Sequence, residues 1–246
     1  MLPQTPQTET QDPSATLLSF LQIAIQPVGQ TMYVWGGGWN EADTGAGIEA
    51  VTLGVSARWA EFASAQDASY DYNTTRYQIH DGLDCSGYVG WAVYNILETE
   101  NGNDGYVGKA TDMAKNFSKL GLGTYIPASK MTRWQPGDIM SMKGHVWISL
   151  GMCDDGSVLL VHASPPGVIL CGTEIKKGTT SDAILLAEEL METYYPDWYR
   201  RFPECSRSKS YLKNASAMRW SILEDPENMA SMTAPEVAKL LWGYNG

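Results

Sequence analysis

Residues 136–163 read PGDIMSMKGHVWISLGMCDDGSVLLVHA, and this stretch determines the fold class. Its apolar residues form three short runs separated by turn residues, a pattern typical of antiparallel strands. We predict strands over 139–142, 145–150 and 157–163, joined by a tight turn at Lys143-Gly144 and a hairpin turn at Asp154-Asp155-Gly156. These strands form the centre of the predicted sheet.

Outward from this stretch, apolar residues recur at helical spacing as well as in strands. We predict helices over 17–25, begun by a cap at Ser14, and over 86–97 and 111–120. After the central strands we predict further strands over 168–171 and 217–222, and helices over 184–193 and 234–242. Helices followed by a run of antiparallel strands favour the α+β class.

The chain divides into a short tail and one large domain. Residues 1–13 are rich in Gln, Thr and Pro, which is typical of a flexible tail or linker, and we expect the domain to span 14–246. Residues 39–81 are irregular but rich in aromatics, so we interpret them as an ordered insertion with one helix near 57–65. The run Gly36-Gly37-Gly38 lacks the Lys and Ser or Thr of a phosphate loop and indicates a turn or a close backbone approach.

The composition excludes two classes of protein. Hydrophobic residues make up 43% of the chain and charged residues 18%, which suits a folded core rather than a disordered chain. No apolar run approaches the roughly 18 residues that a transmembrane helix needs, so an integral membrane protein is excluded. Asp and Glu number 28 against 17 Lys and Arg, a formal net charge of −11, so nucleic acid is not an expected partner.

The first basic residues and the cysteines bear on the cellular compartment. The first Lys or Arg is Arg58, so the sequence lacks the basic segment that begins an export signal. Either the protein is cytosolic, or a leader or upstream domain has been removed. The cysteines are too few and too scattered for a disulfide scaffold, although one bridge among Cys153, Cys171 and Cys205 stays open.

Cys85 stands at the first turn of the helix predicted over 86–97, a position that suits a nucleophile. Unpaired N–H groups and the helix dipole favour an anion there, so we expect a thiol pKa below its free value of about 8.5. His145 and His162 lie on strands joined by a hairpin, so they can be neighbours on one face of the sheet. One imidazole would activate the thiol, and the other would hold the first in the correct tautomer.

The alternatives give the same residues structural roles. Most free cysteines are small buried apolar residues, and most strand histidines are half-buried. A zinc site made of Cys85, His145 and His162 lacks an evident fourth ligand, and no CxxC pair indicates a structural zinc site. We therefore expect no metal.

Segments in four parts of the chain resemble, in order, the NlpC/P60 family of papain-like cysteine peptidases. They are Tyr33-Val34-Trp35-Gly36-Gly37, Asp84-Cys85-Ser86-Gly87-Tyr88-Val89, Pro136-Gly137-Asp138-Ile139 leading into Gly144-His145-Val146, and Val161-His162-Ala163-Ser164 with Gly167-Val168. The resemblance implies a papain-like fold in which a helix bearing the nucleophile packs on an antiparallel sheet. It also implies hydrolysis of peptidoglycan stem peptides, at the γ-D-glutamyl bond to the diamino acid (meso-diaminopimelate or Lys).

The resemblance also implies a role for each matching residue. Cys85 corresponds to the nucleophile, His145 to the general base and then acid, and His162 to the residue that orients it. The substrate-binding positions implied in the same way are Tyr33, Asp84 and Ser86. The mechanism needs no cofactor, and we expect a monomer located outside the cell or at the cell wall, acting on stem peptides.

Two features depart from the family pattern. The insertion over 39–81 separates the tyrosine and cysteine segments, and the hairpin between the two histidines is longer than usual. We hypothesise that Arg58, Arg76 and His80 of the insertion contact substrate carboxylates. An amidase or acyltransferase acting on another acyl substrate, or a silent cell-wall-binding module, is the alternative function.

Overall fold

One mixed sheet of eight strands forms the centre of the computed structural model, which describes residues 15–97, 105–203, 207 and 211–244. The strands run in the order β2-β1-β7-β6-β5-β4-β8-β3. Their bounds are β1 (Met32–Tyr33), β2 (Gly82–Leu83), β3 (Gly123–Ile126), β4 (Ile139–Met142), β5 (His145–Met152), β6 (Val158–Ser164), β7 (Gly167–Gly172) and β8 (Ser216–Trp220). The pair β1–β2 is parallel, whereas the pairs from β1–β7 to β8–β3 are antiparallel.

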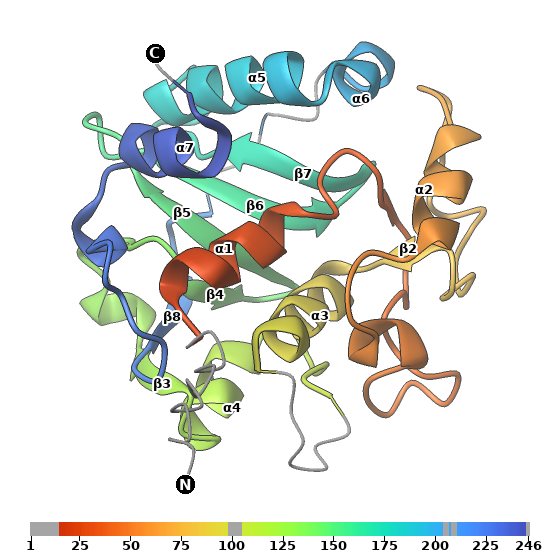
Figure 1. Cartoon of the computed structure of the whole chain (residues 1–246), viewed down its shortest axis with the longest axis horizontal. Helices are drawn as coiled ribbons and strands as arrows, with labels where there is room; N and C mark the ends of the chain where they lie inside the picture. The colour runs from red at the N-terminus through yellow and green to blue at the C-terminus, as the bar shows by residue number, and fades with distance from the viewer. Residues whose placement is uncertain (1–14, 98–104, 204–206, 208–210, 245–246) are drawn as a thin grey trace, which may run out of the picture.

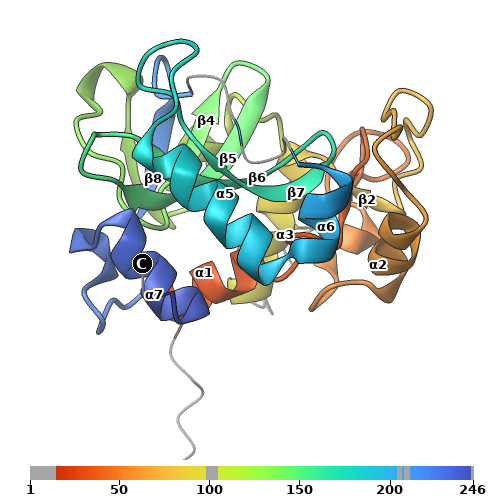
Figure 2. The ribbon, with the colours of Figure 1, turned by 90° about the horizontal axis from the view of Figure 1, so that it is seen from above.

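The helices that the described residues form are α1 (Leu17–Ile25), α2 (Ala57–Ser64), α3 (Cys85–Leu97), α4 (Met113–Lys119), α5 (Asp182–Tyr194), α6 (Pro196–Arg201) and α7 (Ala234–Trp242). Figure 1 shows α1, α3 and α7 in front of the sheet and α5 above β7, and Figure 2 shows α5, α7 and α1 together on one side. The predicted α+β class is confirmed. None of the helices in the described part of the chain is long and apolar enough to cross a membrane.

Most predicted elements are present. The strand over 139–142 and the helices over 17–25 and 234–242 have the predicted bounds, and the other predicted strands and helices are present with shifted ends. Ser14, the predicted cap of α1, lies outside the described residues, and the cap is Thr16, whose side chain accepts the N–H of Ser19 at 3.1 Å. The short strands β1, β2 and β3 and the helix α6 were not predicted.

Helix α3 is buried on nearly all sides and fixes the position of its own first residue. Every residue from Ser86 to Val93 is buried, and the helix packs against α1 and the strands β5 and β6. The hydroxyl of Tyr88 donates to the carbonyl of Ala24 at 2.7 Å, and the indole of Trp91 donates to the carbonyl of Gly54 at 3.1 Å. A helix that is apolar all round belongs in a core, so its N-terminus is held rigidly against the sheet.

The glycine run crosses the start of α3 at very short range. A Cβ atom on Gly87 would collide with the carbonyl of Gly37, and one on Gly38 would lie 2.5 Å from the Cα of Gly87. Gly38 also has a φ of +87°, a conformation that side chains disfavour. The predicted close backbone approach is confirmed, and it places residues 36–38 directly over the N-terminus of α3.

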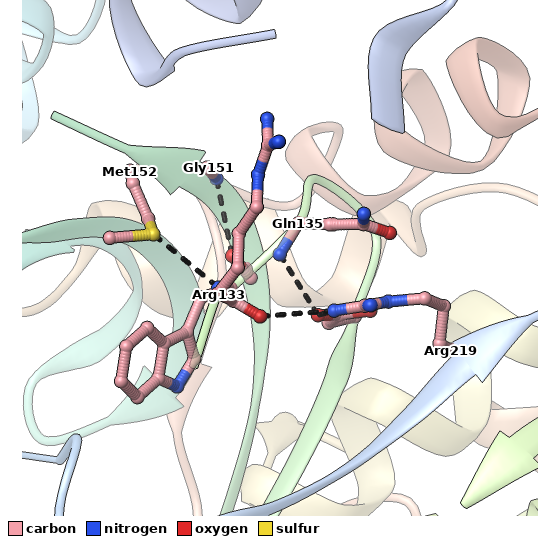
Figure 3. A network of polar contacts seen from close by, with 8 residues as sticks. Arg133, Gln135, Gly151, Met152 and Arg219 are labelled. Carbon is pink, nitrogen blue, oxygen red and sulfur yellow. Dashed lines mark hydrogen bonds and ion pairs between the residues drawn. The ribbon is translucent and has the colours of Figure 1, made fainter. Parts of the chain in front are cut away.

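A buried ion pair ties β4 to β8 at the other end of the sheet. Asp138, which is 1% exposed, accepts hydrogen bonds from the guanidinium of Arg219 at 2.9 and 2.7 Å. The N–H of Gln135 donates to the same carboxylate at 2.9 Å, and Arg219 also donates to the carbonyl of Arg133 at 3.0 Å (Figure 3). This network fixes the turn that leads into β4 and hence the start of the central strands.

Candidate active site

Cys85 is the first residue of α3, and Asp84 caps that helix. The carboxylate Oδ1 of Asp84 accepts the N–H of Gly87 at 2.7 Å and the hydroxyl of Ser86 at 2.8 Å. The indole of Trp39, from the insertion, donates to the Ser86 hydroxyl at 3.0 Å. The thiol therefore lies at the positive end of the helix, between a buried carboxylate and the sheet.

A β-bulge sets the register of the two histidines. The ladder between β5 and β6 pairs Met152 with Val158, Gly151 with Leu159, Ser149 with Leu160 and Ile148 with Val161, shifting by one residue near Leu150. On the far side of the bulge His162 lies opposite Trp147, so it shares a face of the sheet with His145. Without the shift, His162 would lie opposite Ile148 and point to the other face.

The two histidines are hydrogen-bonded to each other, and Cys85 lies beside them. Nε2 of His145 is 2.8 Å from Nδ1 of His162. The backbone N–H of Val146, the residue after His145, donates to the sulfur of Cys85. The structure thus brings together the three residues that the sequence predicted as the catalytic group.

The protonation of the group differs from the sequence-based expectation. Burial, and secondly the charge of Asp84, raise the pKa of the Cys85 thiol to about 12, so the expected lowering by the helix N-terminus is wrong for this structure. Burial lowers the pKa of His145 to about 4, and burial together with His145 lowers the pKa of His162 well below its ordinary value. Desolvation outweighs the helix dipole here, so the resting group is a neutral thiol beside two neutral imidazoles.

The predicted substrate-binding residues line a cavity of about 290 Å³ that also exposes Cys85. Tyr33, Asp84 and Ser86 form part of its wall, and Lys109 adds the one basic side chain among the described lining residues. Burial raises the pKa of Asp84 to about 6, so its carboxylate is ionised at neutral pH. The described lining therefore holds two acidic side chains, Asp43 and Asp84, and one basic side chain.

Sequence reasoning missed two residues of the site. The ring of Tyr211 lies 5.0 Å from the ring of His145 and 5.8 Å from that of His162, and it stacks on Trp147 at 6.3 Å. Cys171, on β7, places its sulfur 3.3 Å from Nε2 of His162. Neither residue belongs to a motif that resembles the family. Only the pairing register of β6 and β7 could have suggested Cys171.

His162, Tyr211 and Cys171 also line a second cavity, of about 690 Å³, which has no lining residue in common with the first among those described. Its wall includes Arg201, whose guanidinium donates to the carbonyls of Ala63 and Gln66. His162 thus borders a cavity other than the one that exposes Cys85.

The structure places two of the three insertion residues near the site and pairs the third, Arg58, with a carboxylate. Arg58 forms an ion pair with Asp81 at 2.6 Å, and His80 is bonded to Glu49. Arg76 lies over the ring of Trp35, 4.8 Å from its centroid, and Trp35 lines the cavity of Cys85. His80 lines a cavity of about 350 Å³ that shares Gly36, Trp39 and Asp43 with the cavity of Cys85. Arg76 and His80 are therefore the two whose positions suit contact with a substrate.

Metal binding and known relatives give no further assignment. Within the described ranges, no three His, Cys, Asp or Glu side chains are arranged to hold a metal ion. Cys205, one of the three candidates for a disulfide, lies outside the described residues. Comparisons with protein-family models, with curated proteins and with solved structures find no match to this chain.

Proposed function

We propose that the protein is a cysteine peptidase of the NlpC/P60 type that hydrolyses peptidoglycan stem peptides at the γ-D-glutamyl bond to the diamino acid. The observation that carries the proposal is the position of Cys85 at the N-terminus of α3, beside a histidine whose Nε2 is bonded to a second histidine. A buried helix bearing the thiol and packed on a largely antiparallel sheet supports a papain-like arrangement.

The direction of the histidine contact supports the assignment of roles. Because Nε2 of His145 is engaged by His162, Nδ1 is the nitrogen left for the thiol proton. The sulfur of Cys85 attacks the carbonyl carbon as His145 takes that proton, and N–H groups at the start of α3 stabilise the oxyanion. His145 then gives the proton to the leaving amine as the C–N bond breaks, and water hydrolyses the thioester.

The neutral resting state determines when charge appears. Since burial favours the uncharged thiol and imidazole, the thiolate–imidazolium pair forms during the attack and does not precede it. A substrate bound in the cavity would place its carbonyl carbon where the sulfur can attack it as the thiol loses its proton. His145 therefore serves as a general base rather than as the permanent partner of a thiolate.

The cavity beside Cys85 suits a peptide with an amino end and a free carboxylate. The ionised carboxylate of Asp84 can accept an ammonium group, with Tyr33 and Ser86 at its side. Lys109 and, over Trp35, the guanidinium of Arg76 offer positive charge to a carboxylate such as that of the γ-linked glutamate. This distribution of charge, in a chain of net charge −11, favours a zwitterionic peptide over a polyanion.

The test is to incubate the purified chain with L-Ala-γ-D-Glu-diamino-acid peptides and to identify the products by mass spectrometry. We expect release of L-Ala-γ-D-Glu by the wild type and by Cys153→Ala, a control at another buried cysteine, but not by Cys85→Ala. Cleavage by Cys85→Ala would refute the assignment of the nucleophile.

Absence of cleavage by the wild type would refute the proposed substrate, and a library of amide and ester substrates would then test the alternative of an amidase or acyltransferase. If the wild type turned over none of these substrates, and if the wild type and Cys85→Ala bound stem peptide equally, the protein would instead be a silent cell-wall-binding module. Action on stem peptides would also place the protein at the cell wall or outside the cell.

A further inference from the structure

Cys171 belongs to a row of polar side chains that crosses three strands. The row runs from His145 on β5 through His162 on β6 to Cys171 on β7. The ladder pairs Leu160 with Cys171 and His162 with Ile169, so His162 and Cys171 are diagonal neighbours on one face. The two contacts in the row measure 2.8 Å between the imidazoles and 3.3 Å from Nε2 of His162 to the sulfur.

A count of protons restricts how this row can function. A neutral imidazole has one N–H, and the contact between the two rings needs one hydrogen between Nε2 of His145 and Nδ1 of His162. If His162 supplies it, the proton of His145 sits on Nδ1, and that nitrogen cannot accept the proton of Cys85. If His145 supplies it, Nδ1 of His145 is free to act as a base, and the proton of His162 sits on Nε2.

The productive arrangement therefore needs an acceptor at Nε2 of His162. The imidazolium form of His145 imposes the same condition, because both of its nitrogens then carry protons and His162 must accept at Nδ1. His162 is 2% exposed and Cys171 is 1% exposed, and the sulfur at 3.3 Å is the protein group placed to accept that N–H. A buried donor without a partner is costly, and this cost is what would favour the unproductive tautomer.

We infer that Cys171 is a positioning residue: its sulfur accepts the Nε2–H of His162, and so keeps both imidazoles in the tautomer in which His145 can act as a base. The inference rests on the proposed function for its consequence in catalysis. It assigns to β7 a fourth member of the site, which acts through His162 and does not touch the substrate.

The tautomers can be measured without any substrate. The chain has three histidines, His80, His145 and His162, so ¹⁵N-histidine labelling and long-range ¹H–¹⁵N correlation at neutral pH give a spectrum simple enough to assign with His→Gln variants. We expect His145 and His162 both to carry the proton on Nε2 in the wild type. A wild-type His162 protonated on Nδ1 would overturn the inference.

Variants at Cys171 link the tautomer to turnover. Cys171→Val fills the position but has no hydrogen-bond acceptor, whereas Cys171→Ser keeps an acceptor. The two variants therefore differ in their ability to accept the Nε2–H of His162. We expect Cys171→Val to move the proton of His162 to Nδ1 and to lower kcat for stem-peptide cleavage about 5- to 150-fold, with KM changed less than about twofold. Cys171→Ser should retain the wild-type tautomers and most of kcat.

Wild-type tautomers and wild-type kcat in a folded Cys171→Val would refute the role of the sulfur. If the wild type does not cleave stem peptides at all, the proposed function fails, but the NMR experiment still decides whether Cys171 sets the tautomer. If Cys171→Val does not fold, the wild-type and Cys171→Ser spectra decide the question. A Cys171→Ser spectrum with the proton of His162 on Nδ1 would then count against the inference.

Discussion

Two buried groups of the site should make opposite contributions to the pH dependence of stability. Burial lowers the pKa of His145 from 6.5 to about 4, so the unfolded chain binds a proton that the folded chain does not. Stability from this group is fully present above pH 6.5 and is lost as the pH falls to 4. The difference in pKa corresponds to about 3 kcal/mol of unfolding free energy.

Asp84 acts in the reverse direction over nearly the same range. Burial raises its pKa from 3.8 to about 6, so the folded chain holds a proton that the unfolded chain has released. This contribution is fully present below pH 3.8 and is lost as the pH rises to 6, again about 3 kcal/mol. In the wild type the two effects nearly cancel between pH 4 and pH 6, and a single substitution should reveal each of them.

The perturbation is His145→Gln, with Asp84→Asn as the matched variant of opposite sign. Urea denaturation at pH 4, 5, 6 and 7 gives the unfolding free energy of each protein. Relative to the wild type, His145→Gln should gain about 3 kcal/mol as the pH falls from 7 to 4, because its acid-sensitive group is gone. Asp84→Asn should gain about 3 kcal/mol as the pH rises from 4 to 7.

A difference between His145→Gln and the wild type that is the same at all four pH values would refute the reasoning, since it would mean that His145 is not held neutral by burial. If His145→Gln lost more unfolding free energy than the wild type as the pH falls from 7 to 4, the predicted direction of the effect would be refuted. The same results would remove the argument that His145 is an uncharged base in the resting protein.

Two further substitutions, and a kinetic measurement on Asp84→Asn, test the fold and the substrate site. Arg219→Met leaves the buried Asp138 without its partner, and the unfolding free energy in urea at pH 7 should fall by about 3–5 kcal/mol; a fall below about 1 kcal/mol would contradict the role of the pair. Gly87→Ala adds a methyl group against the carbonyl of Gly37 and should cost at least about 1–3 kcal/mol in the same assay, whereas an unchanged midpoint would mean that the backbones do not meet. Asp84→Asn should raise the KM for a stem peptide with a free amino end about tenfold and leave the KM for the N-acetylated peptide unchanged. If Asp84→Asn and the wild type have the same KM for the free peptide, Asp84 does not bind the ammonium group.

Local sequence patterns were sufficient for the elements that have strong periodicity and clear ends. The strand over 139–142 lies between turn residues, and the helix over 234–242 has Thr233 and Glu236 as a capping box. Strand β2, which was missed, lacks such signals. Strand β2 has two residues, and its hydrogen bonds come from β1, fifty positions earlier in the chain, so pairing and not propensity defines it.

The candidate site was predictable in its residues but not in its electrostatics. A helix start and a hairpin are local features, and together with the family resemblance they predicted Cys85, His145 and His162 as one group. The direction in which the thiol pKa shifts depends on how deeply Cys85 is buried and on the orientation of Asp84. Both are set by the insertion and the glycine run. Tyr211 and Cys171 reach the histidines from segments with no motif, so only the assembled sheet identifies them.

The β-bulge near Leu150 shows why the pair of histidines depends on more than the pattern of its strands. Side chains alternate between the two faces of a sheet, so a shift of the pairing register by one residue moves a side chain to the other face. The register between β5 and β6 therefore decides whether His162 shares a face with His145. The turn at Asp154-Asp155-Gly156 fixes one register at the tip, and that register alone would turn His162 away from His145. The extra residue in β5 corrects the shift, and the contact of His162 with Cys171 on β7 requires the same face. The length of the hairpin and the composition of the site are therefore linked, because a longer hairpin with an uncorrected shift would separate the base from its partner.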